Sequence, residues 1–261
     1  MVRFAVSFLS RFVPRHHLQR FSGLVLKVIG VFYLGNKFED PITGKKYRKL
    51  LPYGRINSRP NALAPHSMSL ERHRLLWLYL KEKTDFFTKQ QKVLHIAPEY
   101  CFIKRFQKLP NIEYVTADLI SPWAKVKLDV QGMPFKSNSF DVVFCNHVLE
   151  HVPNDHKAMS ELYRVMKPGG FGIFQVPIDT SLNKTYEDSS ITTPEEREKH
   201  FGQRDHLRQY GRDYPDKLRN AGFIVTEDDF VNTLPNKLAE RYALPSNEVI
   251  YFCVKPITPQ Q

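Results

Sequence analysis

Four apolar runs lie between Lys92 and Pro177, and they read VLHIA (93–97), IEYVTA (112–117), VKLDV (126–130) and SFDVVFCN (139–146). The last run is continuous, as a central parallel strand requires. Helical periodicity follows from Asp155 and ends at KPGG (167–170), a basic last turn followed by Pro and Gly. Residues 171–177 read as a further buried strand. Strands that alternate with helices predict a doubly wound α/β sheet, whose ligand lies beyond the carboxyl ends of the strands.

Short motifs within these runs and between them form a recognisable combination. They are Asp129, MPF (133–135), FDVV (140–143), LEHV (149–152) and the ELYRVMKPGG of residues 161–170. Each piece alone is weakly specific, but together they resemble the core of class I S-adenosylmethionine-dependent methyltransferases. The resemblance covers about residues 90–255, most of a domain of ordinary size. It implies a Rossmann-like doubly wound sheet of the class I type, with S-adenosylmethionine as the cofactor.

The resemblance also implies which residues contact the cofactor. Asp118 and Asp129 follow neighbouring strands of the predicted sheet. The family pattern assigns Asp118 to the ribose hydroxyls, and Asp129 with the following backbone at Val130 to the adenine. Asn146 and His147 come directly after the fourth strand, where they would line the methionine side.

The loop after the first strand departs from the family pattern Asp-x-Gly-x-Gly-x-Gly. Residues 95–101 read HIAPEYC, so every glycine is replaced. Glycine allows close backbone approach and positive φ, and Pro98 lacks a donor N–H. One hypothesis is that Ala97 and Glu99 hold the cofactor in another way, with Glu99 on its amino group. The other is that binding has been lost and the fold is a relic. We favour the first because Asp118 and Asp129 are both retained.

The segment that follows the fifth strand, residues 178–215, is long and polar and contains HFGQRDHLRQYGRD (200–213). Such loops form the substrate side of this fold. In methyltransferases that resemble this chain, the run faces the active site. His206 is the first candidate for a general base, oriented by Asp205, and His151 is the second. Tyr210 completes the predicted catalytic set. A base is needed only for an un-ionised hydroxyl or amine acceptor. The alternative is that DHLR (205–208) is an ion-pair network that anchors the loop.

The composition and charge set limits on the class of protein. A chain of 261 residues with 42% hydrophobic residues can bury one core plus an appendage. The three cysteines are far apart, so we predict no disulfide framework and a cytoplasmic setting. The net charge is +11, and residues 1–60 hold twelve Lys and Arg against two acidic residues. The basic character therefore belongs to the N-terminal segment.

Residues 1–35 read as a pair of basic amphipathic helices separated by Pro14. No cleavage site follows a clean apolar region, so we do not predict a signal peptide. The apolar run 21–34 is shorter than the roughly 20 residues of a spanning helix and contains Lys27. The segment could lie peripherally on an anionic membrane. It could also cap the main domain with its charges solvated, and we favour this second interpretation.

Residues 36–85 read as a short hairpin followed by an amphipathic helix. The hairpin resembles a zinc ribbon in which Cys-Pro-x-Cys pairs hold the ion. The four ligand positions here are Asp40, Thr43, Ala64 and Ser67. Tetrahedral zinc needs thiolate or imidazole donors, and Ala64 offers none. We therefore predict no metal and a hairpin held by packing alone.

The sequence thus predicts three segments: a basic helical segment (1–35), a degenerate zinc-ribbon-like hairpin plus helix (36–85) and a methyltransferase domain (86–261). The predicted function is methyl transfer from S-adenosylmethionine to a small or medium-sized acceptor. One alternative is a non-catalytic or membrane-associated protein that retains the fold. The other is an RNA methyltransferase, which is not favoured because the basic segment lacks aromatic platforms for bases.

Overall fold

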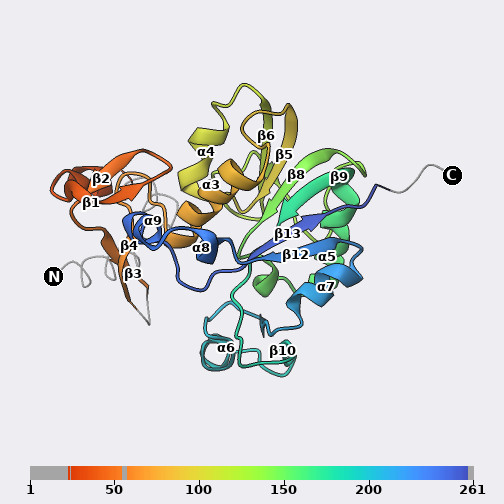
Figure 1. Ribbon diagram of the computed structural model, residues 1–261. Coiled ribbons are helices and arrows are strands. Elements are labelled where there is room, and N and C mark those ends of the chain that lie inside the picture. Colours follow the sequence, from red (N-terminus) through yellow and green to blue (C-terminus); the bar gives the residue numbers. More distant parts are fainter. Residues whose placement is uncertain (1–22, 24, 55–57, 258–261) are drawn as a thin grey trace. The chain divides into compact units, whose positions relative to one another are not determined.

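The computed structural model describes residue 23 and residues 25–54 and 58–257 (Figure 1). It divides into two compact units. Unit 1 contains the described residues up to Phe87, together with Glu99–Arg105 and Phe230–Glu248. Unit 2 contains Thr88–Pro98, Phe106–Asp229 and the described residues from Val249 onward. Two segments of the predicted methyltransferase domain thus belong to unit 1.

Unit 2 is built on a seven-stranded sheet in the order β12-β13-β9-β8-β5-β6-β7. The strands are β5 (Gln91–Ile96), β6 (Ile112–Asp118), β7 (Val126–Lys127), β8 (Phe140–Cys145), β9 (Met166–Ile173), β12 (Ile224–Asp228) and β13 (Ile250–Val254). The pairs from β7 to β9 are parallel, and β13 pairs antiparallel with both β9 and β12. The strand order reverses between β5 and β8, which is where sheets of this kind bind ligands. The predicted α/β doubly wound fold is confirmed.

The register of the parallel strands brings their carboxyl ends to one level. Ile96 at the end of β5 pairs with Ala117 of β6 on one side and with Cys145 of β8 on the other. The residues that follow these three positions therefore leave the sheet side by side. The strand-end residues that the sequence singles out consequently lie along a single edge of unit 2.

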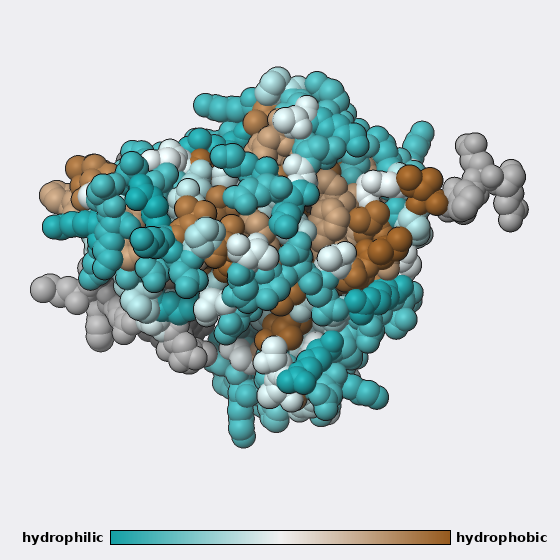
Figure 2. Space-filling model, in the orientation of Figure 1, coloured by the Kyte–Doolittle hydropathy of each residue, from teal (hydrophilic) through white to brown (hydrophobic). Residues whose placement is uncertain are grey.

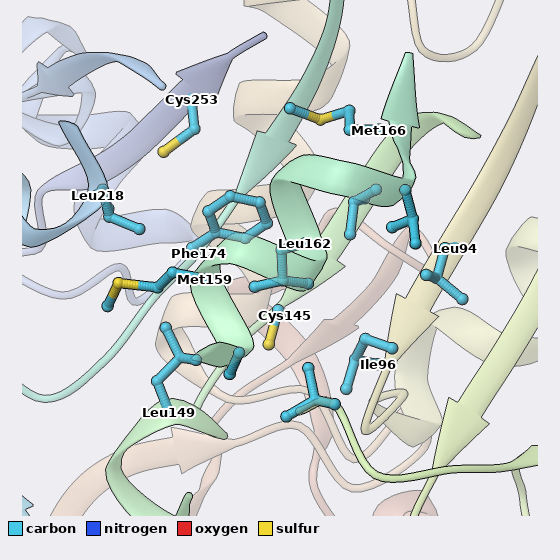
Figure 3. Close-up of a cluster of buried hydrophobic side chains, with 14 of the residues drawn as sticks. Leu94, Ile96, Cys145, Leu149, Met159, Leu162, Met166, Phe174, Leu218 and Cys253 are labelled. Carbon is cyan, nitrogen blue, oxygen red and sulfur yellow. The ribbon is translucent and has the colours of Figure 1, made fainter. Parts of the chain in front are cut away.

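Helices cover the sheet of unit 2 with apolar faces. They include α5 (Asp155–Val165) and α7 (Tyr214–Asn220), which pack against β9 and β12 respectively. The Asn154 side chain caps α5 by accepting a hydrogen bond from the Lys157 N–H at 2.9 Å. Figure 3 shows Met159 and Leu162 of α5 in one buried cluster with Leu94 of β5, Cys145 of β8 and Phe174, which follows β9. This buried cluster fixes the strands that carry the site.

Between β9 and β12 the chain forms smaller elements of unit 2, β10 (Tyr186–Glu187), α6 (Pro194–Phe201) and β11 (Arg208–Gln209). A capping box of Thr193 and Glu196 starts α6, and Gly202 ends it with φ of +83°. The β10–β11 pair is antiparallel, so it returns residues 208–210 toward the sheet. This is the segment predicted to form the substrate side.

Unit 1 contains two hairpins, β1 (Leu34–Asp40) with β2 (Lys45–Tyr47) and β3 (Leu51–Tyr53) with β4 (Arg59–Leu63). Its helices are α3 (Glu71–Lys83), α4 (Tyr100–Phe106, whose last residue belongs to unit 2), α8 (Phe230–Thr233) and α9 (Asn236–Arg241). Arg74 of α3 is fully buried, and its guanidinium donates to the carbonyl oxygens of Ala62, Ser69, Tyr242 and Ala243. This charge is stabilised by hydrogen bonds to several carbonyls and ties residues far apart in the chain.

Residues at or near the four positions where a zinc ribbon would carry its ligands are linked by hydrogen bonds, most of them to the carboxylate of Asp40. Its Oδ2 accepts a hydrogen bond from the Thr43 hydroxyl at 2.7 Å, and its Oδ1 accepts from the Ile42 N–H and the Ser69 hydroxyl. Ala64, fully buried, is joined to Ser69 through its backbone N–H. The prediction that packing alone holds the hairpin is therefore wrong, because a hydrogen-bonded carboxylate contributes.

Other predictions have mixed outcomes. Residues 1–22, which make up most of the predicted basic helical segment, lie outside the described residues, so its membrane contact stays a prediction. Within the described part of the chain, no helix has the length and apolar character needed to cross a membrane. The helix from Asp155 ends at Val165 and β9 already starts at Met166, so the predicted boundaries of 167–170 and 171–177 are wrong.

Candidate active site at the carboxyl edge of the sheet

Ala97 follows β5 and takes a left-handed backbone conformation with φ of +49°. Its N–H donates to the carbonyl oxygen of Ala117 at 2.8 Å, so the turn stays attached to β6. A left-handed conformation is costly for a residue with a Cβ and is the usual reason for glycine at such turns. Ala97 thus takes, under strain, a backbone conformation that glycine adopts without steric cost.

Asp118 ends β6 and is partly buried. Its Oδ1 accepts hydrogen bonds from the N–H groups of Ile120 (2.7 Å) and Ser121 (2.6 Å). Its Oδ2 has no hydrogen-bond partner among the residues that the structure describes. One oxygen therefore shapes the following loop, and the other is available to accept from a ligand hydroxyl.

Asp129 lies two residues beyond β7 and is exposed. Both of its carboxylate oxygens accept from the Gln131 side-chain amide, and Oδ1 also accepts from the Gln131 N–H at 2.8 Å. Val130 is buried in the main core, with 5% of its surface exposed. The Asp129 carboxylate is thus engaged within its own turn, while Val130 anchors that turn.

Asn146 and His147 follow β8. The Asn146 Oδ1 accepts from the Gln175 N–H at 3.2 Å, and the His147 N–H donates to the Gln175 carbonyl oxygen at 2.7 Å. His147 has φ of +54°, a second left-handed residue other than glycine at this edge. Gln175 in turn accepts from the Tyr251 N–H through its side chain. Asn146 and His147 are therefore held in a fixed turn against β9 and β13.

A cluster of side chains forms beyond this turn. The short helix η1 (Leu149–His151) carries Glu150 and His151, and His206 comes from the loop after α6. Ligand atoms of these three side chains lie within 4.8 Å of one another. The two imidazole rings meet edge to face with centroids 4.8 Å apart. Glu150 and His206 are 1% and 4% exposed, so the cluster is largely shielded from solvent.

Hydrogen bonds fix both imidazoles of this cluster. Nδ1 of His206 donates to the Phe201 carbonyl oxygen at 3.1 Å, and Nδ1 of His151 donates to the Asp205 carbonyl oxygen at 3.1 Å. Because a carbonyl can only accept, each neutral ring carries its hydrogen on Nδ1 and a lone pair on Nε2. Burial lowers the pKa of His206 below the ordinary histidine value, against the opposing effect of the Glu150 carboxylate.

The predicted roles of Asp205 and Tyr210 need correction. Asp205 does not orient His206, since Phe201 does so, and its exposed carboxylate lies 3.6 Å from Nδ1 of His151 instead. Tyr210 is fully buried in the core, and its hydroxyl donates to Oδ2 of Asp155 at 2.9 Å. Burial and the Asp155 charge raise the pKa of Tyr210 far above its ordinary value. Its hydroxyl is thus committed to a structural contact.

Arg208 joins the two segments that carry the cluster. Its Nη1 donates to the carbonyl oxygens of Leu149 and Val152 at 2.8 and 2.6 Å, and its Nη2 to that of Pro153 at 3.0 Å. The Leu207 N–H donates to the Glu150 carbonyl oxygen at 2.8 Å. The alternative interpretation of residues 205–208, a network that anchors the loop, is therefore correct for Arg208. The anchoring places His206 against Glu150 and His151.

Two further observations concern the surroundings. Glu99 accepts the Phe102 N–H through its carbonyl at the start of α4 and belongs to unit 1, so its contact with the cofactor stays a prediction. The surface over α6 and β10 is largely hydrophilic (Figure 2). The structure thus brings together His151, His206 and Asp205, and places Ala97, Asp118, Asp129 and Asn146 along the strand ends.

Part of this chain matches a known protein family. Residues 92–174 match the family described as "Methyltransferase domain". Residues 92–174 of this chain therefore carry the sequence pattern of a methyltransferase domain. The matched residues run from β5 into the turn after β9, so they include the strand ends that hold Ala97, Asp118 and Asn146. The segment that follows β9, with His206, lies outside the match.

Similarity to individual proteins is narrower. The chain is 32% identical over 107 residues to sterol 24-C-methyltransferase of Schizosaccharomyces pombe, covering 40% of this chain and 27% of that protein. It is 34% identical over 84 residues to the ubiquinone/menaquinone biosynthesis C-methyltransferase of Enterobacter sp. (strain 638), covering 31% and 29%. The chain thus spans less than a third of the length of these relatives.

Among solved structures, the cyclase SpnF superposes with a TM-score of 0.54 at 14% identity, covering 84% of this chain and 92% of that one. At this identity the likeness concerns the fold alone.

Sequence reasoning missed three residues of the site. Glu150 is buried in the cluster, Gln175 fixes the turn after β8, and Arg208 anchors the loop. Glu150 was visible only as part of the family motif LEHV. The Glu-His pair between two apolar residues, Leu149 and Val152, is the available signal for a buried site residue.

Proposed function

We propose that this protein transfers the methyl group of S-adenosylmethionine to a small or medium-sized acceptor. The observation that carries the proposal is the strand-end edge of unit 2, where Ala97 keeps a left-handed turn beside Asp118 and its unpaired Oδ2. The family model described as a methyltransferase domain matches residues 92–174, which include the same strands. The positive φ of Ala97 supports the proposal, because one residue of this loop takes a left-handed conformation although the loop contains no glycine.

The strand-end residues fit the cofactor. Asp118 Oδ2 can accept from a ribose hydroxyl, and the exposed turn at Asp129 and Val130 can receive the adenine. Asn146 and His147, held against Gln175, would face the methionine part. When bound, S-adenosylmethionine supplies an electrophilic methyl group on a positively charged sulfur. The chain's own task is then alignment of the acceptor and exclusion of water.

The acceptor side is formed by the cluster of Glu150, His151 and His206. In the metal-free protein the buried Nε2 of His206 can take a proton from an acceptor hydroxyl or amine, and His151 can do so second. Asp205 contacts His151 and would support that ring. Arg208 acts as a positioning residue because it holds the backbone of Leu149 and Val152.

The relatives compared above are, by name, a sterol 24-C-methyltransferase and a C-methyltransferase of ubiquinone/menaquinone biosynthesis. The family match ends at residue 174, before the acceptor-side segment. We therefore propose a small-molecule acceptor without assigning it to either class. The proposed setting is the cytoplasm, with peripheral contact of residues 1–35 with anionic membrane as the accompanying proposal.

Calorimetric titration of the purified chain with S-adenosylmethionine tests the proposal. We expect one site per chain with measurable heat. If the folded protein gives no heat, methyl transfer is excluded and the alternative of a non-catalytic protein that retains the fold is supported. Retention on RNA that weakens with salt would instead support an RNA methyltransferase.

A further inference from the structure

The cluster of Glu150, His151 and His206 contains polar atoms that the described structure leaves without partners. Oε2 of Glu150 and Nε2 of His206 are buried and make no hydrogen bond to any described residue. Both side chains are more than nine-tenths buried. A buried acceptor left unpaired costs about 1–3 kcal/mol, so two of them close together indicate a ligand that the protein chain does not supply.

The other polar atom of each side chain is held in place. Nδ1 of His206 donates to the Phe201 carbonyl and Nδ1 of His151 to the Asp205 carbonyl. Oε1 of Glu150 lies 3.5 Å from Nδ1 of His147. This is the arrangement of metal ligands, in which an outer partner fixes the ring tautomer or the carboxylate and leaves one electron pair for the ion.

The number of hydrogen-bond acceptors in the cluster argues against a water molecule as the occupant. One ligand atom from each of the three side chains lies within 4.8 Å of the other two, and the atoms left without a partner in Glu150 and His206 are Oε2 and Nε2. Because Nδ1 of His151 donates to the Asp205 carbonyl, Nε2 is the acceptor that this ring offers. A water molecule has only two hydrogens to donate, so at least one acceptor would stay unpaired. Neither imidazole lies within ion-pairing distance of Glu150 among the described contacts, so a protonated ring does not satisfy the carboxylate directly.

We propose that Glu150, His151 and His206 bind one divalent transition-metal ion. Two imidazole nitrogens and one carboxylate oxygen suit Zn²⁺, Fe²⁺ or Co²⁺, whereas Mg²⁺ and Ca²⁺ prefer oxygen ligands alone. Ligand atoms around such an ion lie about 3–4 Å apart. The donors of this cluster, which lie within 4.8 Å of one another, need to close by about 1 Å through side-chain rotation.

Three protein ligands leave at least one coordination position open, as in catalytic rather than structural sites. An oxygen of the acceptor would occupy it, which favours an acceptor that carries a hydroxyl group. Nε2 of His206 is then a metal ligand and no longer a base. The inference that the acceptor carries a hydroxyl group rests on the proposed function, but metal binding itself does not. The proposal replaces the expectation of no metal, which considered only the frames at residues 40–67.

The test is titration of the untagged, chelator-stripped chain with CoCl₂, followed by visible absorption of the bound Co²⁺. We expect one equivalent to bind with d–d bands. Glu150→Gln and His206→Gln should each weaken binding more than tenfold. His156→Gln is the matched control because His156 is exposed on α5, outside the cluster. Replacement of the adjacent His16 and His17 by Gln controls for binding at the N-terminus.

The proposal is overturned if the folded wild-type chain binds no Co²⁺, or if the His206→Gln and His156→Gln variants titrate alike. Thermal unfolding by circular dichroism establishes that each variant is folded. If the buried substitutions prevent folding, His151→Gln at the partly exposed position must show the same loss. Titration of the same protein with S-adenosylmethionine is independent, so failure of the metal site and failure of the methyltransferase proposal are distinguishable.

Discussion

The hydroxyl of Tyr210 donates a hydrogen bond to Oδ2 of Asp155 over 2.9 Å, and both side chains are buried. Asp155 opens α5, and Tyr210 follows β11, 55 positions later in the chain. The contact therefore ties the acceptor-side segment to the helix that packs on β9. It gives this tyrosine, which lies in a polar, histidine-rich run, a role in the fold.

Replacement of Tyr210 by Phe should lower the free energy of unfolding by about 1–2 kcal/mol, because Asp155 loses a buried donor. Affinity for S-adenosylmethionine should stay within a factor of three, since the hydroxyl bonds to Asp155 and not to a residue of the predicted cofactor site. Urea unfolding and calorimetry measure the two effects. Tyr186→Phe is the control, because the Tyr186 hydroxyl contacts His200 at the surface. A large loss of cofactor affinity in Tyr210→Phe alone would restore a role for Tyr210 in the site.

The stability of unit 2 should depend on pH through Asp155. Burial alone would raise the pKa of Asp155, but Arg208, Lys217 and the Tyr210 hydroxyl lower it below the ordinary value near 3.8. A carboxylate whose pKa is depressed by folding stabilises the protein above the unfolded value. That contribution is lost as the pH falls through the folded value.

This dependence is measurable by comparing wild type with Asp155→Asn. We expect wild type to be the more stable at pH 7 in urea unfolding, and the difference to shrink as the pH is lowered below about 4. Asp216→Asn, at an exposed position on α7 where the carboxylate pairs with Arg219, is the comparison for a surface carboxylate. A difference between wild type and Asp155→Asn that is constant with pH would contradict the assignment.

Replacement of Asp118 by Asn should weaken binding of S-adenosylmethionine more than tenfold, which corresponds to about 1.4 kcal/mol. The asparagine oxygen can still accept from the Ile120 and Ser121 N–H groups, so the loop keeps its shape while the unpaired Oδ2 is lost. Asp129→Ala should also weaken binding more than tenfold. Calorimetric titration gives both values, and equal affinity of Asp118→Asn and wild type would remove Asp118 from the cofactor site.

Ala97→Gly should raise the free energy of unfolding by about 0.5–1 kcal/mol, because glycine accepts the φ of +49° without steric cost. Cofactor affinity should be retained. Ala158→Gly, inside α5, is the matched comparison and should lower stability by about 1 kcal/mol or more. Urea unfolding of the two variants checks the sign of each change. Destabilisation by Ala97→Gly would show that the alanine side chain is needed at this turn.

The sheet of unit 2 could be predicted from the sequence because its parallel strands coincide with apolar runs that end in acidic residues or in turns. Asp118, Asn146 and His147 occupy the predicted strand ends for the same reason. The start of β9 at Met166 was not predictable from KPGG, because its pairing with β8 through an irregular register overrides the local helix-stop signal.

The cluster could be predicted only in part. The sequence singles out His151 in LEHV (149–152) and His206 in the polar run 200–213. Their contact, however, depends on the hydrogen bonds of Arg208 to the backbone of residues 149–153. Whether Asp205 orients His206 or His151 is a matter of loop geometry that no spacing rule gives. The assignment of residues 99–105 and 230–248 to unit 1 likewise rests on contacts between distant parts of the chain.

The carboxylate of Asp40, with its hydrogen bonds to Thr43, Ile42 and Ser69, has a consequence for biogenesis. A zinc ribbon folds fully only when a zinc ion binds its ligands, so its folding depends on the supply of zinc in the cell. In this chain hydrogen bonds to the Asp40 carboxylate hold the hairpin in place of a metal ion, and they form as soon as Thr43, Ile42 and Ser69 reach that carboxylate. The hairpin should therefore mature normally in zinc-starved cells and survive treatment with strong chelators.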